Sequence, residues 1–248
     1  MSLLLLIAAL SCDGERLTDE MGREYYLYLP KKLEPAKTYW LVVGVHGYKG
    51  AGKGAGGLAS WTDRGDCIVV GPTFPSDGYQ MLQQNAGKQL VDLFALLGKK
   101  YKLQPKLFVA GFSGGAQFSH RFMMAHPELV IGCAAHSAGT WATGGAYLEI
   151  NAEAANIPFV MSCGEKDTDK STADSPMGRC EWAQAFEKDL AKNGFAFQAK
   201  VWPGVGHALS KGAETMTSEC FDVATKMRPL VDDDFAAARK DVDAGRTG

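Results

Sequence analysis

The sequence predicts an α/β protein built on a twisted, mostly parallel β-sheet with helices on both faces. Short apolar runs alternate along the chain with longer segments whose apolar residues recur every three or four positions. The short runs are apolar throughout, which is typical of strands that helices cover on both faces. Strands that alternate with helices form doubly wound sheets, so we expect about eight strands in a single domain over residues 23–230.

The first half of the chain predicts three strands and a helix in order. Residues 23–30 alternate polar and apolar side chains and end at a proline, which predicts an antiparallel edge strand. Continuous apolar runs at residues 39–45 and 67–74 predict buried strands, and the glycine-rich segment between them predicts a loop. Residues 85–101 have apolar side chains at helical spacing and predict an amphipathic helix.

The second half continues the alternation. Residues 106–124 join an apolar strand directly to an amphipathic helix, which Pro127 ends. A further helix at residues 177–192 is followed by Asn193-Gly194, and helical spacing resumes after His207. The segment at residues 138–156 is too short for a large lid. Buried strands are predicted at residues 131–137, 157–163 and 197–202.

Composition and charge exclude several classes of protein. Of the 248 residues, 46% are hydrophobic and 22% are charged, and the formal net charge is −2. Since no block of lysine and arginine stands out, we expect no nucleic acid partner. The six cysteines form no C-x-x-C pair, which argues against a zinc knuckle or a redox motif. A disulfide between Cys180 and Cys220 is left open, while Cys67, Cys133 and Cys163 are expected to be buried in strands.

The two ends of the chain differ from the middle. Within residues 1–22, an apolar core at residues 3–10 has the length of an export signal and is too short to span a bilayer. The segment lacks the positively charged n-region and the A-x-A cleavage site of a signal peptide, and residues 9–12 only partly match a lipoprotein cleavage box. We expect a secreted, periplasmic or lipid-anchored protein, with a cytoplasmic location as the alternative. Residues 231–248 predict a short charged helix and tail.

A serine turn lies between the central strand and its helix. Gly111-Phe112-Ser113-Gly114-Gly115 fits G-x-S-x-G, a turn that presents a serine above a sheet. The pattern is short and the chain is rich in glycine, so the prediction also needs a histidine, an acid and oxyanion donors. Ser137 stands in a near-match, AHSAG, but no helix is predicted directly after it.

Four segments that follow predicted strands match, in order, the landmarks of one superfamily. They are His46-Gly47-Tyr48, the serine turn, Gly164-Glu165-Lys166-Asp167 and Gly204-Val205-Gly206-His207. Over residues 25–226 the chain resembles the α/β-hydrolases, and within them the esterases that include polyhydroxybutyrate depolymerase-like and feruloyl-esterase-like proteins. The resemblance implies an α/β-hydrolase fold with a small or absent lid, and neither a cofactor nor a metal.

A serine hydroxyl needs a base to take its proton and an acid to orient that base. We expect Ser113 to be the nucleophile. His207 is the expected base, because it alone of the five histidines follows the last predicted strand, as the order Ser, Asp, His requires. Asp167 is the expected acid. Asp169 is the alternative, followed by Asp174 or Glu165.

Acyl transfer also needs hydrogen-bond donors where the carbonyl oxygen becomes negative. We expect the backbone N–H groups of Gly114 and Tyr48 to supply them. The side chains of Tyr48 and Trp141 are expected to contact the substrate, with ordinary loop packing as the alternative for both. His46 is expected to hold the shape of the oxyanion loop. His120 and His126 are expected to pack or cap on the helix after the serine, and His136 is expected to end a strand.

A second motif overlaps the oxyanion loop. Gly47 to Gly54, GYKGAGKG, matches the phosphate loop G-x-x-x-x-G-K-[ST] except at its last position. The hydroxyl of that position ligates Mg²⁺, and neither neighbouring apolar run ends in the aspartate that would hold the metal. Nucleotide binding is therefore not expected.

These observations predict a serine carboxylic-ester hydrolase that works through an acyl-enzyme. Its substrate is a small-molecule or polymeric ester, such as a polyester or an ester on plant polysaccharide. The alternatives are a serine peptidase or acyltransferase on the same fold and a non-catalytic binding protein with a hydrolase fold. No membrane span is expected, and the oligomeric state is left open.

Overall fold

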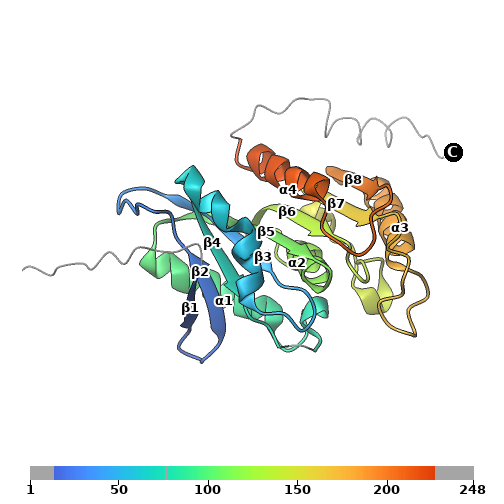
Figure 1. Cartoon of the computed structure of the whole chain (residues 1–248), viewed down its shortest axis with the longest axis horizontal. Coiled ribbons are helices and arrows are strands. Elements are labelled where there is room, and N and C mark those ends of the chain that lie inside the picture. The colour runs from blue at the N-terminus through green and yellow to red at the C-terminus, as the bar shows by residue number, and fades with distance from the viewer. Residues whose placement is uncertain (1–13, 76, 227–248) are drawn as a thin grey trace, which may run out of the picture.

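An eight-stranded sheet forms the centre of the computed structural model, which describes residues 14–75 and 77–226 (Figure 1). Its strand order is β1-β2-β4-β3-β5-β6-β7-β8. The pairs β1–β2 and β2–β4 are antiparallel and all the others are parallel. The strands are β1 (Glu15–Thr18), β2 (Glu24–Tyr28), β3 (Tyr39–Val45), β4 (Cys67–Pro72), β5 (Leu103–Phe112), β6 (Val130–His136), β7 (Phe159–Gly164) and β8 (Phe197–Trp202).

Helices cover both faces of this sheet. The helices α1, α2 and α3 pack on one face, and α4 packs on the other together with the 3₁₀ helix η1 (Figure 1). Consecutive residues of a strand point to opposite faces, so Leu41 and Val43 of β3 lie under the first layer and Val42 lies under the second. The helices are η1 (Gly52–Arg64), η2 (Tyr79–Met81), α1 (Ala86–Lys100), α2 (Gly114–Ala125), η3 (Gly145–Tyr147), η4 (Ala152–Ala154), α3 (Arg179–Lys192) and α4 (Lys211–Ala224).

This architecture confirms the predicted fold class and corrects one detail at the edge of the sheet. β2 is antiparallel as expected, but it is not an edge strand, because β1 pairs with it from Glu15 to Thr18. β1 is only four residues long and mostly exposed, so it leaves no apolar pattern in the sequence. The apolar core of the expected export signal, residues 3–10, and the tail at residues 231–248 lie outside the described residues.

The glycine-rich segment after β3 is the second correction. It was expected to be a loop, but from Gly52 onward it forms η1. Gly52 passes so close to β4 that a Cβ on it would overlap the carbonyl oxygen of Gly71. Leu58 and Trp61 of η1 then pack on the sheet. The glycines therefore permit close packing here, a requirement that local propensity does not show.

The connection between β6 and β7 contains only the short helices η3 and η4. As the sequence predicted, the described chain carries no large lid there. The longest segment without helix or strand near the carboxyl ends of the strands is instead the one between β7 and α3, residues 165–178. It forms part of the site described below.

The positions of the cysteines do not fit the disulfide between Cys180 and Cys220 that the sequence left open. Cys180 lies in the first turn of α3 and faces the core on one side of the sheet, whereas Cys220 lies on α4, on the opposite face. The five described cysteines are free and buried, as expected for Cys67, Cys133 and Cys163. The sulfur of Cys180 lies 3.1 Å from the sulfur of Cys163 on β7. Cys163 is therefore the partner within reach of Cys180.

We expect a disulfide between Cys163 and Cys180 when the protein refolds in a glutathione redox buffer, with two hydrogens lost to glutathione disulfide. Burial raises the pKa of the Cys163 thiol, so the folded protein should react slowly. Peptide mapping without reductant should show this link, and Cys180→Ser should remove it while Cys220→Ser leaves it. A link that contains Cys220 would contradict the expectation.

Candidate active site

Ser113 lies in a strained turn between β5 and α2. Its backbone has φ 56° and ψ −119°, and its N–H donates to the carbonyl oxygen of His136 on β6 at 2.9 Å. Residues in such sparsely populated conformations cost about 1–3 kcal/mol and persist only where surrounding contacts enforce them. The turn lifts the Ser113 side chain above the carboxyl ends of the strands, where ligands bind in open α/β sheets.

The contacts that enforce this turn involve two glycines. A Cβ on Gly115 would overlap the carbonyl oxygen of Val45 and lie 2.9 Å from that of His46. A Cβ on Gly111 would in turn overlap the backbone of Gly115. The first turn of α2 therefore packs directly against the end of β3, and side chains at these two positions would push the helix away from it.

Three of the predicted residues meet at this turn. Nε2 of His207 lies 3.0 Å from Oγ of Ser113, and Nδ1 of His207 lies 2.7 Å from Oδ2 of Asp167. The carboxylate accepts from Nδ1–H, which leaves Nε2 free to accept the proton of the serine hydroxyl. Asp167 is 2% exposed, so its negative charge is held away from water beside the imidazole.

The alternative acids do not reach His207. Asp169 contributes its backbone carbonyl oxygen to Arg179. Glu165 accepts from the N–H of Gly204 at 2.8 Å, and Asp174 is exposed. Of the four carboxylates considered from the sequence, Asp167 alone is hydrogen-bonded to the imidazole.

The two expected oxyanion donors lie close together. A Cβ on Gly114 would lie 2.8 Å from the backbone nitrogen of Tyr48, so the oxyanion loop passes directly beside the start of α2. Gly114 is the first residue of α2, and N–H groups in the first turn of a helix have no partner within the helix. The positive end of the helix dipole adds to their attraction for a negative oxygen.

Hydrogen bonds from buried side chains hold the oxyanion loop. His46 accepts from the N–H of Phe74 at Nε2 (2.9 Å) and donates from Nδ1 to the carbonyl oxygen of Gly47 (2.7 Å). Tyr79, which the sequence analysis did not single out, donates to the carbonyl oxygen of His46 at 2.8 Å. Burial lowers the pKa of His46, so the ring stays neutral as this pattern requires. His46 thus has the structural role that the sequence predicted.

A cavity of about 660 Å³ opens over the serine. Ser113, Gly114 and Tyr48 line it, together with residues of the β6–β7 connection and of the 165–178 segment. The ring of Tyr48 is half exposed, and its hydroxyl donates to Asp77 at 3.2 Å. It therefore lies at the rim of the cavity.

Trp141 does not line this cavity, so its expected role in substrate binding is wrong. It is completely buried and stacks on Phe186 of α3, with ring centroids 5.1 Å apart. The ring of His120 lies 4.8 Å from it on another side. The position after a strand suggested a site residue, but α3 covers the indole, and only the folded chain shows that contact.

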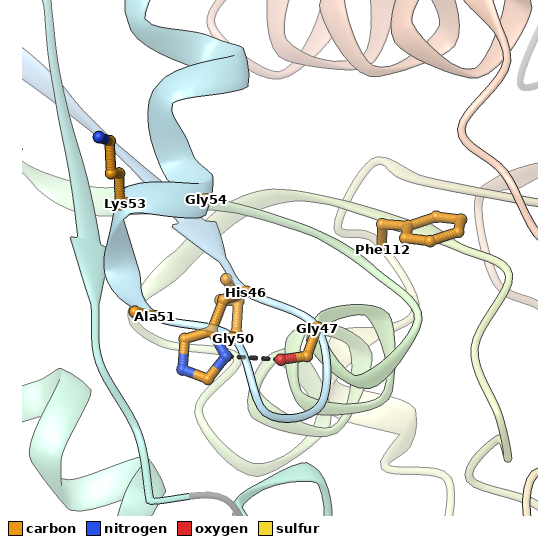
Figure 2. A pocket seen from close by; sticks show the side chains of 8 residues that line it. His46, Gly47, Gly50, Ala51, Lys53, Gly54 and Phe112 are labelled. Carbon is orange, nitrogen blue, oxygen red and sulfur yellow. Dashed lines mark hydrogen bonds between the residues drawn. The ribbon is translucent and has the colours of Figure 1, made fainter. Parts of the chain in front are cut away.

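A second cavity, of about 490 Å³, lies beside the oxyanion loop and does not include Ser113 (Figure 2). Gly47, Gly50, Gly54 and Phe112 are among its lining residues. Figure 2 shows Lys53 extending away from His46 and Gly47, the residues joined there by a hydrogen bond. The lysine of the phosphate-loop-like motif therefore does not face the oxyanion loop.

Arg179 is a site residue that the sequence analysis missed. Its Nη1 donates to Oδ1 of Asp167 at 3.3 Å, on the carboxylate oxygen that His207 does not use, and the side chain lines the serine cavity. It begins α3, twelve positions after Asp167. No motif marks the residue, so its role depends on how the 165–178 segment folds back.

His120 and His136 have structural roles. His120 donates from Nδ1 to the carbonyl oxygen of Ala116 and accepts from the N–H of Ala142. His136 lies between the hydroxyls of Ser162 and Thr217, at 2.7 and 2.8 Å. Burial lowers the pKa of His136 to about 4.

The described residues contain no group of three or more histidine, cysteine, aspartate or glutamate side chains that could hold a metal ion. None of their helices combines the length and the apolar character needed to cross a membrane.

We expect Gly115→Ala to lower the free energy of unfolding by about 1–3 kcal/mol, the usual cost of forcing an extra carbon into a packed site. The matched control is Gly98→Ala in α1, where a Cβ meets nothing within 4 Å. That change should be neutral or stabilising, since alanine is the better helix former. Urea unfolding measures both, and equal stability of the two variants would contradict the packing described here.

The buried His136 should make the protein less stable in acid. Its folded pKa is about 4 and the unfolded value is about 6.5, so the unfolded chain binds more protons between these values. Stability should therefore be full above about pH 6.5 and fall toward pH 4, by up to about 3 kcal/mol from this group. Urea unfolding at several pH values measures how the free energy of unfolding changes with pH. This change should be smaller for His136→Asn than for the wild type, and an equal change would contradict the prediction.

The sequence matches no family model and is not detectably similar to any curated protein. Solved structures with a similar fold do exist. An S-formylglutathione hydrolase from Agrobacterium tumefaciens superposes with a TM-score of 0.64 at 13% identity, over 88% of this chain and 98% of that one. A ferulic acid esterase from Anaeromyces mucronatus, in complex with ferulic acid, gives 0.61 at 16% identity, over 85% and 88%.

A thermostable esterase gives a TM-score of 0.65 at 17% identity over 86% of this chain. The match covers 62% of that esterase, so this chain spans less than two thirds of its length. Identities this low show the fold alone. The similarity to these solved structures, taken with the strand order and the helices on both faces, shows that this chain has the α/β-hydrolase fold.

Proposed function

We propose that this protein is a serine carboxylic-ester hydrolase that works through an acyl-enzyme intermediate. The observation that carries the proposal is the hydrogen-bonded chain from Asp167 through His207 to Ser113, which ends in an open cavity. The backbone nitrogens of Tyr48 and Gly114 lie beside the serine. A nucleophile, a base, an orienting acid and two oxyanion donors are the groups that acyl transfer needs.

In the first half of the reaction, Oγ of Ser113 forms a bond to the ester carbonyl carbon while its proton passes to Nε2 of His207. The carbonyl oxygen becomes negative and accepts hydrogen bonds from the N–H groups of Tyr48 and Gly114. Asp167 stabilises the imidazolium. When the carbon–oxygen bond to the alcohol breaks, His207 gives its proton to the departing alcohol and the acyl group stays on Ser113.

In the second half, water replaces the alcohol. Nε2 of His207 takes a proton from water, whose oxygen attacks the acyl carbon through the same oxyanion site. The bond to Ser113 breaks, the serine regains its proton from His207, and the acid leaves. All of these steps use the chain's own side chains and backbone, so the mechanism requires no cofactor or metal.

The substrate class follows from the opening above the serine. Because only short helices lie between β6 and β7, the cavity is not roofed by a separate lid. An open cavity suits a bulky or polymeric ester, such as a polyester or an ester on polysaccharide. The resemblance to polyhydroxybutyrate depolymerase-like and feruloyl-esterase-like proteins supports the same substrate class. We also expect the side chain of Tyr48, at the rim of the cavity, to contact the substrate.

The decisive measurement compares hydrolysis of 4-nitrophenyl acetate and butyrate by the wild type and by Ser113→Ala. We expect kcat/KM to fall by about 10⁴-fold or more, because the nucleophile is lost while the fold is retained. Ser137→Ala is the matched control and should retain activity, since Ser137 does not line the cavity. Full activity in Ser113→Ala would disprove the proposal.

The same assay separates the two candidate acids. Asp167→Asn should lower kcat by about 10⁴-fold, because the amide favours the wrong imidazole tautomer. Asp169→Asn should have little effect, since its contact with Arg179 is made by the backbone. Peptide substrates in parallel with the esters would reveal a peptidase on the same fold.

A further inference from the structure

The serine cavity has an unusual balance of charge. Arg179 is the one charged residue among the described residues that line it, and none of them is acidic. The other polar lining groups are neutral hydroxyls and amides, such as Thr140, Ser171 and Gln117. An uncharged alkyl ester has no negatively charged group that could pair with a guanidinium in this cavity.

The guanidinium of Arg179 has N–H donors that are not used in hydrogen bonds to the described residues. Among the contacts of the described residues, Nη1 makes both of its hydrogen bonds, to Oδ1 of Asp167 and to the carbonyl oxygen of Asp169. Nε and Nη2 remain available, and the side chain is 17% exposed. A guanidinium donates readily in pairs to a carboxylate, and such charge-assisted bonds are strong where water is partly excluded.

A second arginine lies directly behind the cavity wall. Arg121 of α2 is completely buried and donates only to neutral oxygens of Gln117, Thr140 and Tyr147. These three residues are also among those that line the cavity. Burial lowers the pKa of Arg121 to about 9, so it is still protonated at neutral pH.

The charges around the cavity therefore do not cancel. Arg179 is compensated by Asp167, but no carboxylate of the described residues pairs with Arg121. Its charge acts through a protein interior of low dielectric, which makes the cavity attractive to an anion. Asp77, which accepts from the hydroxyl of Tyr48 at the rim, is exposed, so water and salt screen it.

We propose that the cavity selects esters whose acyl part carries a carboxylate, which Arg179 binds while Ser113 attacks the ester carbonyl. This inference rests on the proposed ester hydrolysis and specifies its substrate class as monoesters of dicarboxylic acids. Arg179 is then a specificity-determining residue that also positions Asp167. Arg121 adds a favourable field without touching the substrate.

The test compares matched pairs of activated esters. Mono-4-nitrophenyl succinate, glutarate and adipate carry a terminal carboxylate, and 4-nitrophenyl butyrate, valerate and hexanoate are similar esters without one. We expect at least one acidic ester to have a kcat/KM about tenfold or more above its neutral partner, the size expected for one charge-assisted contact. The preference should shrink as salt is raised.

Variants of Arg179 are judged by the ratio of the two kcat/KM values, because the contact with Asp167 affects every ester. Arg179→Gln should abolish the preference for the acidic ester, and Arg179→Lys should restore part of it. Arg16→Gln, an exposed arginine on β1, should leave the ratio unchanged. A wild type without preference, or a preference that survives in Arg179→Gln, would overturn the inference and leave the ester hydrolase intact.

Binding measurements separate this inference from the proposed reaction. Ser113→Ala protein should bind monomethyl glutarate about tenfold more tightly by calorimetry than Ser113→Ala/Arg179→Gln protein. Methyl valerate should bind both proteins equally. If the esters are not hydrolysed but this difference is found, the reaction is wrong and the anion site stands. If the two proteins bind monomethyl glutarate equally, the anion site is wrong.

Discussion

The site depends on the close approach of the first turn of α2 to the end of β3. Gly115 lies against the carbonyl oxygen of Val45, and this contact leaves no room for a side chain. It brings Gly114 beside the backbone nitrogen of Tyr48 and forces the strained conformation of Ser113. One packing constraint therefore sets the direction of the Ser113 side chain and the position of the backbone N–H groups of Tyr48 and Gly114.

The segment between β7 and α3 has two roles that depend on each other. Asp167 near its start orients His207, while Arg179 just past its end binds the other oxygen of the same carboxylate. The N–H of Cys180 also donates to the carbonyl oxygen of Asp167, so the segment closes on itself at the start of α3. Ser171, Thr172 and Ser175, which lie between the two, line the cavity, so the segment carries both Asp167 and part of the cavity wall.

Three of the described histidines are buried and hydrogen-bonded within the fold. His46, His120 and His136 are each hydrogen-bonded at both ring nitrogens, and burial lowers the pKa of all three. His207 differs because its ring is one-third exposed and faces the serine. Burial thus distinguishes the three histidines that are hydrogen-bonded within the fold from His207, whose ring faces Ser113.

The sequence by itself determined the alternation of strands and helices and the order of Ser113, Asp167 and His207 along it. Such features are local: an apolar run, a glycine turn or a residue just after a strand is visible without knowing what packs against it. The strand order then brings these strand ends together, because parallel strands end at one edge of the sheet.

Only the tertiary structure decided which side chains line the cavity and which are covered. Trp141 follows a strand just as the site residues do, yet α3 buries it, while Arg179 has no local signature and reaches Asp167 across a loop. The helix in the glycine-rich segment and the proximity of the Cys180 and Cys163 sulfurs also arise from contacts between distant parts of the chain. The burial of a side chain and the charge around a cavity depend on many residues that are far apart in the sequence. They therefore cannot be predicted from a single stretch of the chain.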